Sequence, residues 1–176
     1  ILLPGIFLTA YQTSPLFNQR IHSAIDQIVN YDVETVAMRQ ILNSSIGGRI
    51  LYTLNSWEII KENPILGVGT GDFPNEYKKI SLKNSPAAPY ATNPHNMYIL
   101  VLVQLGIVGL VSMLSILYYQ IKLSFAQSNK FFRDVGFALP LLFLVIMWSD
   151  SYLLGHFTGL LFVFFSSFLY KDFEKS

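Results

Sequence analysis

The feature that most constrains this chain is an uninterrupted apolar run, Met97–Tyr119, which contains no charged residue. Its 23 residues would form a helix about 34 Å long, enough to cross a hydrocarbon core of about 30 Å. The composition agrees, because 52% of the residues are hydrophobic and only 13% are charged, whereas roughly a quarter of a soluble domain is charged. The run therefore predicts a transmembrane helix over residues 97–119.

Two further apolar segments follow this run. Residues 135–149 contain Pro140, which should kink a helix, and residues 152–170 end in a cluster of phenylalanines. Only Ser149–Ser151 separates the two, so we expect a tight hairpin of transmembrane helices. Residues 1–10 are apolar but too short to span a membrane alone, and the chain opens without Met. The sequence predicts an all-α integral membrane fold, as the carboxy-terminal fragment of a larger polytopic protein with a truncated first helix.

The basic residues between the apolar segments predict the orientation. The connector 120–134 carries Lys122, Lys130 and Arg133 against Asp134, and the tail 171–176 carries Lys171 and Lys175. Short segments rich in Lys and Arg remain in the cytoplasm, whereas the charge of a long loop says little about topology. Residues 11–96 then form a large loop on the opposite side of the membrane.

Several parts of this large loop have apolar residues at helical spacing, which predicts amphipathic helices near the membrane surface. These parts are residues 21–29, 33–41 and 48–62. In the last of them, the apolar residues near one face are Ile50, Leu51, Leu54, Trp57 and Ile60. Beyond Phe73 and through Asn93 the sequence is rich in Pro, Asn, Ser and Lys, which favours irregular structure.

Charge and composition exclude several classes of function. The net charge of +1 argues against a nucleic-acid partner, and the absence of cysteine excludes disulfides, thiolate metal sites and a cysteine nucleophile. Neither an HExxH motif nor clustered histidines are present, so we expect no metal and no cofactor. The glycine-rich segment Gly67–Asp72 lacks the Lys-Ser/Thr ending of a phosphate loop. We interpret it as a turn that needs positive φ or close backbone approach.

His95 is the leading candidate for chemistry, since a histidine can exchange protons near neutral pH and this one immediately precedes the apolar run. Under the predicted topology, Asp150 and His156 lie at the same membrane face, and an Asp beside a His would orient its ring. A packed or solvated histidine at a helix start remains the alternative for His95. For His156, a hydrogen bond between helices is at least as good an interpretation.

Arg49 is the leading candidate for phosphate binding. An arginine here is most simply an interfacial residue that reaches lipid headgroups, but its guanidinium could also hold a phosphate or diphosphate through paired donors. Arg39 and Arg20 could do the same with weaker positional support.

In order along the chain, these residues resemble the O-antigen ligase/polymerase family of bacterial polytopic membrane proteins. The resemblance covers roughly residues 45–110, and it is specific as a combination although each piece alone is weak. The residues that carry it are Ser45-Ile46-Gly47-Gly48-Arg49, Trp57, Glu62-Asn63-Pro64-Ile65-Leu66-Gly67-Val68-Gly69-Thr70-Gly71-Asp72-Phe73, Tyr77, Pro94-His95-Asn96-Met97-Tyr98 and Val103-Gln104-Leu105-Gly106-Ile107-Val108-Gly109-Leu110.

The resemblance implies an inverting, metal-independent glycosyltransferase of the GT-C type in the bacterial inner membrane, with residues 11–96 in the periplasm. Such enzymes move a glycan from undecaprenyl diphosphate to an acceptor hydroxyl, which in ligases belongs to a lipid A-core sugar. The resemblance makes His95 the general base and Arg49 a ligand of the diphosphate; Arg39 and Asn96 are further candidates for substrate binding. Arginines that the family carries in earlier loops are missing, so we expect the fragment alone to be inactive.

Two alternatives remain open on the sequence. A polysaccharide polymerase or a protein oligosaccharyltransferase of the same family would use the same residues with another acceptor. A non-catalytic subunit that binds or transports a lipid carrier would belong to a different class, and intramembrane His and Asp residues would suit proton-coupled transport. The position of the motifs in the outer loop disfavours it, because transport sites are usually near the bilayer midplane.

Overall fold

The computed structural model describes residues 2–29, 45–86 and 91–170. Every regular element within these residues is helical, which confirms the all-α prediction. The chain divides into two compact units, Ile1–Leu51 and Tyr52–Ser176. The predicted helix over 33–41 and the candidate residue Arg39 lie outside the described residues.

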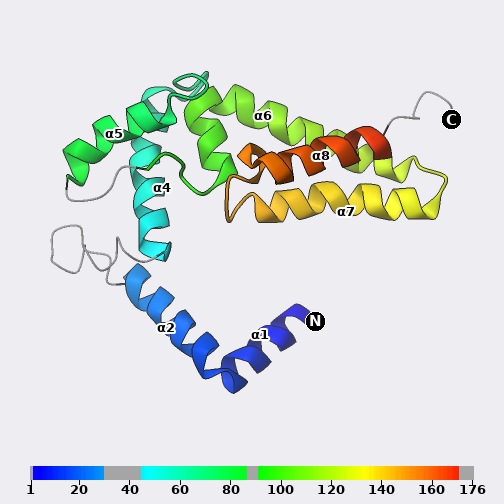
Figure 1. Cartoon of the computed structure of the whole chain (residues 1–176), viewed down its shortest axis with the longest axis horizontal. Helices are drawn as coiled ribbons and strands as arrows, with labels where there is room; N and C mark the ends of the chain where they lie inside the picture. Colours follow the sequence, from blue (N-terminus) through cyan, green and yellow to red (C-terminus); the bar gives the residue numbers. More distant parts are fainter. Residues whose placement is uncertain (1, 30–44, 87–90, 171–176) are drawn as a thin grey trace. The chain divides into compact units, whose positions relative to one another are not determined.

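The first unit begins with two helices, α1 (Leu2–Thr13) and α2 (Pro15–Val29), which meet at a bend (Figure 1). The bend forms at Ser14, whose Oγ accepts a hydrogen bond from the backbone N–H of Phe17 at 3.3 Å, as a residue that caps a helix start does. Proline follows immediately, at a position where its missing N–H costs nothing.

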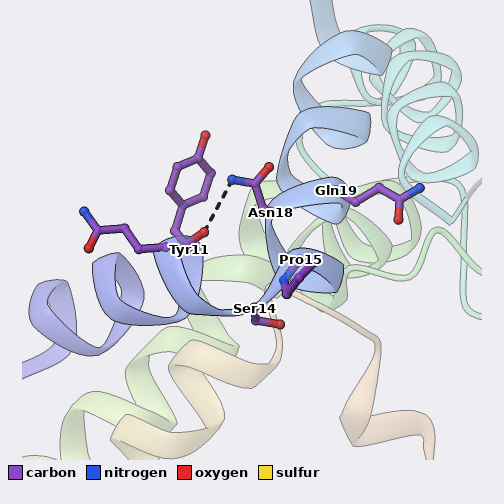
Figure 2. Close-up of a pocket in the computed structure, with 6 residues that line it drawn as sticks. Tyr11, Ser14, Pro15, Asn18 and Gln19 are labelled. Carbon is purple, nitrogen blue, oxygen red and sulfur yellow. Dashed lines mark hydrogen bonds between the residues drawn. The ribbon is translucent and has the colours of Figure 1, made fainter.

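An open pocket of about 490 Å³ lies at this bend (Figure 2). The amide of Asn18 donates to the backbone carbonyl of Tyr11 across it at 3.4 Å. None of its lining side chains carries a formal charge at neutral pH, so the pocket offers no ion pair to an anionic substrate. The lining residues are Tyr11, Gln12, Ser14, Pro15, Asn18 and Gln19.

Helix α4 (Ser45–Glu62) runs across the boundary between the units, and its later turns belong to the second. The apolar residues predicted for one face differ in burial. Leu51 and Ile60 are buried, whereas Leu54 and Trp57 are 49% and 54% exposed. Asn55, Ser56 and Ile59 are also buried. Asn55 is tolerated inside because its amide donates to the hydroxyl of Tyr77 at 3.1 Å.

Helix α5 (Phe73–Asn84) occupies part of the segment that we expected to be irregular, so that prediction is wrong. Its proline lies in the first turn, where no N–H is required of it. Phe73, Tyr77 and Ser81 recur every four residues and are buried on one face of the helix. The polar composition of this segment belongs to the opposite, exposed face, where Lys79 pairs with Glu76 at 2.5 Å, and this pairing raises the pKa of Lys79.

Helix α6 (Met97–Phe125) is the one helix in the described part of the chain that is long and apolar enough to cross a membrane. It is not the straight span that we predicted, because Gly106 has φ 62° and ψ −160°. Figure 1 shows the helix turning a corner. The straight part after the break, residues 107–125, is about 28 Å long, close to the thickness of the hydrocarbon core.

The break in α6 is completed by the backbone of residues 64–69. The N–H groups of Val68 and Gly69 donate to the carbonyls of Val103 and Gln104 at 2.8 and 2.9 Å. In return, the N–H groups of residues 107 and 108 donate to the carbonyls of residues 64 and 65 at 2.9 and 3.3 Å. These four bonds replace the helical bonds that the break removes, so the backbone polar groups at the break keep their partners.

Gly67 confirms the prediction of positive φ and close backbone approach for the glycine-rich segment, and Gly106 on the other side of the junction has the same properties. Gly67 has φ 69°, and a Cβ there would lie 2.4 Å from the backbone carbon of Gln104. A Cβ on Gly106 would lie 2.2 Å from the carbonyl oxygen of Ile65. Both contacts are with backbone, so no side-chain rotation could relieve them.

Helices α7 (Lys130–Ile146) and α8 (His156–Leu169) pack beside the long part of α6 (Figure 1). Phe143 and Phe162 join them through rings 4.6 Å apart. The predicted three-residue hairpin is wrong, because residues 147–155 separate the helices and include a short 3-10 turn, η1 (Tyr152–Leu154). Helix α8 is about 21 Å long, shorter than a hydrocarbon core of about 30 Å. The prediction that α7 and α8 span a membrane stays a prediction.

Candidate active site

His95 lies in the link that leads into α6, in a tight turn that begins at Asn93. The side-chain oxygen of Asn93 accepts the backbone N–H of His95 at 2.9 Å, a local turn that asparagine commonly forms. Pro94 between them is fully buried. His95 itself has φ 53°, a left-handed conformation that costs a residue with a Cβ about 1–2 kcal/mol. Strain of this kind persists where the surrounding structure enforces it, and it is enriched at functional sites.

Asp150 reaches His95 from the link between α7 and η1. The His95 Nδ1 and Asp150 Oδ1 atoms are 3.1 Å apart, and the two side chains are 44% and 37% exposed. The same carboxylate oxygen accepts the backbone N–H of Ser151 at 2.7 Å. Because an ionised carboxylate can only accept, the hydrogen of a neutral His95 ring is placed on Nδ1. The lone pair of Nε2 is then available to an acceptor hydroxyl.

Aromatic side chains form one wall beside His95. The ring of Tyr52, from α4, lies 6.2 Å from the imidazole and 5.9 Å from the ring of Tyr77. Tyr77 stacks on Phe73 with ring centroids 5.4 Å apart, and both are completely buried. Tyr52 is the half-buried ring of this wall, and the buried rings of Tyr77 and Phe73 support it from behind.

Asn96 joins the start of α6 to the end of α7. Its side-chain oxygen accepts the backbone N–H of Ile99 at 3.1 Å and so caps α6, and its amide donates to the carbonyl of Trp148 at 3.1 Å. The N–H of Met97 also donates to the carbonyl of Met147 at 2.9 Å. These contacts give Asn96 a structural role beside His95, and its predicted role in substrate binding stays a prediction.

Two further candidates within the described residues are Arg49 and His156. Arg49 is an exposed residue near the start of α4 and belongs to the first unit, whereas His95 belongs to the second. Its predicted partnership with His95 therefore stays a prediction. His156 opens α8 with an exposed side chain and makes no hydrogen bond to His95 in the structure as described. No group of three or more potential metal ligands lies together within residues 2–29, 45–86 and 91–170.

The first three backbone donors of the glycine-rich segment are bound within the protein. The N–H groups of Val68 and Gly69 are occupied by α6, and that of Gly67 donates to the carbonyl of Asn63 at 3.1 Å. These donors therefore do not point at a bound anion.

Sequence reasoning did not identify Tyr52, Asn93 or Ser151 as parts of this site. The Asn-Pro pair before His95 is a recognised turn signal and could have identified Asn93. Ser151 was assigned only to a linker, and no spacing in the sequence relates it to a residue 58 positions away.

Comparison with known proteins identifies the family of the chain. A family model described as O-antigen ligase matches residues 1–114, which is more than half of the chain. The match includes His95 and the first part of α6, whereas Asp150 lies beyond it. A comparison with curated proteins gives no match.

Proposed function

Because the chain belongs to the O-antigen ligase family, whose members are ligases and glycosyltransferases, we propose that it transfers a glycan from undecaprenyl diphosphate to an acceptor hydroxyl on a lipid A-core sugar. The reaction would take place at the periplasmic face of the bacterial inner membrane. The observation that carries the proposal is the contact of 3.1 Å between His95 and Asp150, which orients a histidine ring at the end of the helix pair α6–α7.

In the proposed reaction, Nε2 of His95 removes the proton from the acceptor hydroxyl. The hydroxyl oxygen forms a bond to the anomeric carbon while the bond from that carbon to the diphosphate breaks, and the diphosphate leaves with the electron pair. A single displacement of this kind inverts the anomeric configuration. A positioned base of this type typically contributes about 10²–10⁴-fold to a rate.

The leaving diphosphate needs positive charge rather than a proton. Arg49 and Arg39 are the candidates for this role, since a guanidinium can bind phosphate oxygens in pairs and can stabilise charge that develops in the transition state. In this mechanism the arginines supply the charge stabilisation, so no metal takes part.

The test is transfer by the full-length protein that contains this chain. The purified enzyme is supplied with a glycan on undecaprenyl diphosphate and with lipid A-core, a second repeat unit or a protein as acceptor, in a buffer that contains EDTA. We expect transfer to lipid A-core, and product on another acceptor would instead indicate a polymerase or a protein oligosaccharyltransferase.

His95→Ala should reduce this transfer by roughly 10²–10⁴-fold without loss of membrane insertion. His156→Ala is the matched control, because it removes a histidine that makes no bond to His95 and should leave the rate close to that of the wild type. Normal transfer by His95→Ala would refute the general-base role. Ion-coupled flux in proteoliposomes without transfer would instead support a transport subunit.

A further inference from the structure

One oxygen atom connects the two links that carry His95 and Asp150. Oδ1 of Asn93 accepts the backbone N–H of His95 at 2.9 Å and the hydroxyl of Ser151 at 2.7 Å. A carbonyl oxygen has two lone pairs, so both bonds can form together. Ser151 is only 4% exposed, and it follows Asp150 directly in the chain. The two residues of the proposed base are thus joined through a second, more buried path.

The direct contact between His95 and Asp150 is too exposed to set their geometry unaided. Both side chains are more than one third exposed, and the interaction of exposed charged groups is weakened by water and salt. The backbone of His95 is also in a conformation that a residue with a Cβ rarely adopts. Keeping the imidazole of His95 and the carboxylate of Asp150 within hydrogen-bond distance therefore calls for a nearby, more buried group.

We propose that Asn93 is a positioning residue for the proposed glycan transfer. Its Oδ1 atom binds the backbone N–H of His95 and the hydroxyl of Ser151, and so holds together the two links that carry His95 and Asp150. The inference rests on the proposed role of His95 as general base. Asn93 does not touch the substrate, and it acts on catalysis only through the orientation of the imidazole. A small displacement of a catalytic group can lower a rate by about 10²-fold.

The chemistry of the side chain predicts which replacements are tolerated. Asp has the same length and keeps an oxygen that can accept both bonds, so Asn93→Asp should retain most of the activity. Gln keeps the amide but moves the oxygen by one methylene group, so Asn93→Gln should be impaired. Asn93→Ala removes the acceptor and leaves the buried hydroxyl of Ser151 without its partner, which should lower stability as well as activity.

The experiment measures kcat, the KM for the lipid-linked donor and thermal melting in the full-length protein. We expect Asn93→Ala to lower kcat by roughly 10- to 100-fold while the donor KM changes little. The double variant Asn93→Ala/Ser151→Ala no longer buries an unpaired hydroxyl, so its melting temperature should recover towards that of the wild type. Its kcat should remain as low as that of Asn93→Ala, because positioning is still lost.

Asn75→Ala is the matched control, since it removes another asparagine that makes one side-chain bond, to Asp72 at 3.0 Å, on the exposed surface. It should leave kcat unchanged. If kcat recovers together with melting in the double variant, Asn93 is only a structural residue and the inference is overturned. A wild-type kcat for Asn93→Ala while His95→Ala is inactive would overturn this inference alone, whereas an active His95→Ala would overturn the proposed function itself.

Discussion

Two loops of this protein use positive φ for different purposes. In the loop of residues 64–69, glycine with positive φ lets the backbone approach the break in α6 and exchange four hydrogen bonds with it. In the turn of residues 93–96, a histidine has positive φ, and its side chain is held by Asp150. In the first loop, backbone polar groups form hydrogen bonds that stabilise the fold. In the second, Nδ1 of His95 is bound by Asp150, and Nε2 is the ring nitrogen proposed to act on substrate.

The contrast shows that positive φ alone does not mark a functional site. A glycine adopts it without a steric penalty, so Gly67 and Gly106 are explained by packing alone. At His95 the same conformation is unfavourable, and the surrounding bonds must maintain it. The useful criterion is therefore which residue type carries the strain and whether its polar groups remain available.

The largest effect is expected where glycine is required for packing. Gly106→Ala would place a Cβ 2.2 Å from the carbonyl oxygen of Ile65 and should disrupt the bonds that complete α6. Unfavourable φ and the loss of two or more backbone bonds together predict a destabilisation of about 2–5 kcal/mol. Thermal melting of the full-length protein in detergent measures it.

Gly71→Ala is the matched control for this prediction. Gly71 also has positive φ, 84°, but a Cβ there would meet nothing within 4 Å. It should therefore cost only the conformational term, about 1–2 kcal/mol. Equal losses in the two variants would show that the contact with the loop of residues 64–69 contributes nothing.

The next effect concerns activity. Asp150→Asn keeps the shape of the side chain but removes its charge, and the amide can donate as well as accept, so the ring of His95 is no longer held with its hydrogen on Nδ1. We expect kcat to fall by roughly 10²–10⁴-fold with little change in melting temperature. Asp134→Asn, at the other end of α7 beside Arg133, should have no effect on transfer. A wild-type rate for Asp150→Asn would remove Asp150 from the site.

The smallest effect measures the strain at His95 directly. His95→Gly and His95→Ala both lack the imidazole and should both be inactive. They differ in backbone preference, so the glycine variant should be more stable by about 1 kcal/mol, seen as a higher melting temperature. Equal stability would show that the turn does not impose positive φ in solution, and the contrast between the two loops would then fail.

Much of the fold could be predicted because hydrophobic pattern dominates helices in a membrane protein. The apolar run that begins at Met97 does form a long helix, and α2 lies over the expected periodic segment. The segment that contains α5 was misread because its composition is polar, although Phe73, Tyr77 and Ser81 supply a buried face. A buried face of only three residues is too narrow to be recognised from the sequence, and it is identified only when the residues that pack against it are known.

For the candidate site, the sequence could predict which residues take part and which residues adjoin them in the chain. It could not predict contacts between segments that are far apart in the sequence. The sequence placed Asp150 at the same membrane face as His95 and offered it as a group that could orient the ring, but whether the two meet depends on how α7 ends. The break at Gly106 was also not predicted, because its replacement bonds come from residues 64–69.

By itself, the sequence determined the helical class and the long apolar segment of α6, and it singled out His95 as the candidate for chemistry, because these depend on local composition and on the residue types present. Tertiary structure alone decided that α6 is bent, that Asp150 orients His95, and that Asn93 and Ser151 share a hydrogen bond across 58 positions of the chain. The physical reason is that a hydrogen bond between distant segments requires both to be placed within about 3 Å, and no local pattern records that distance.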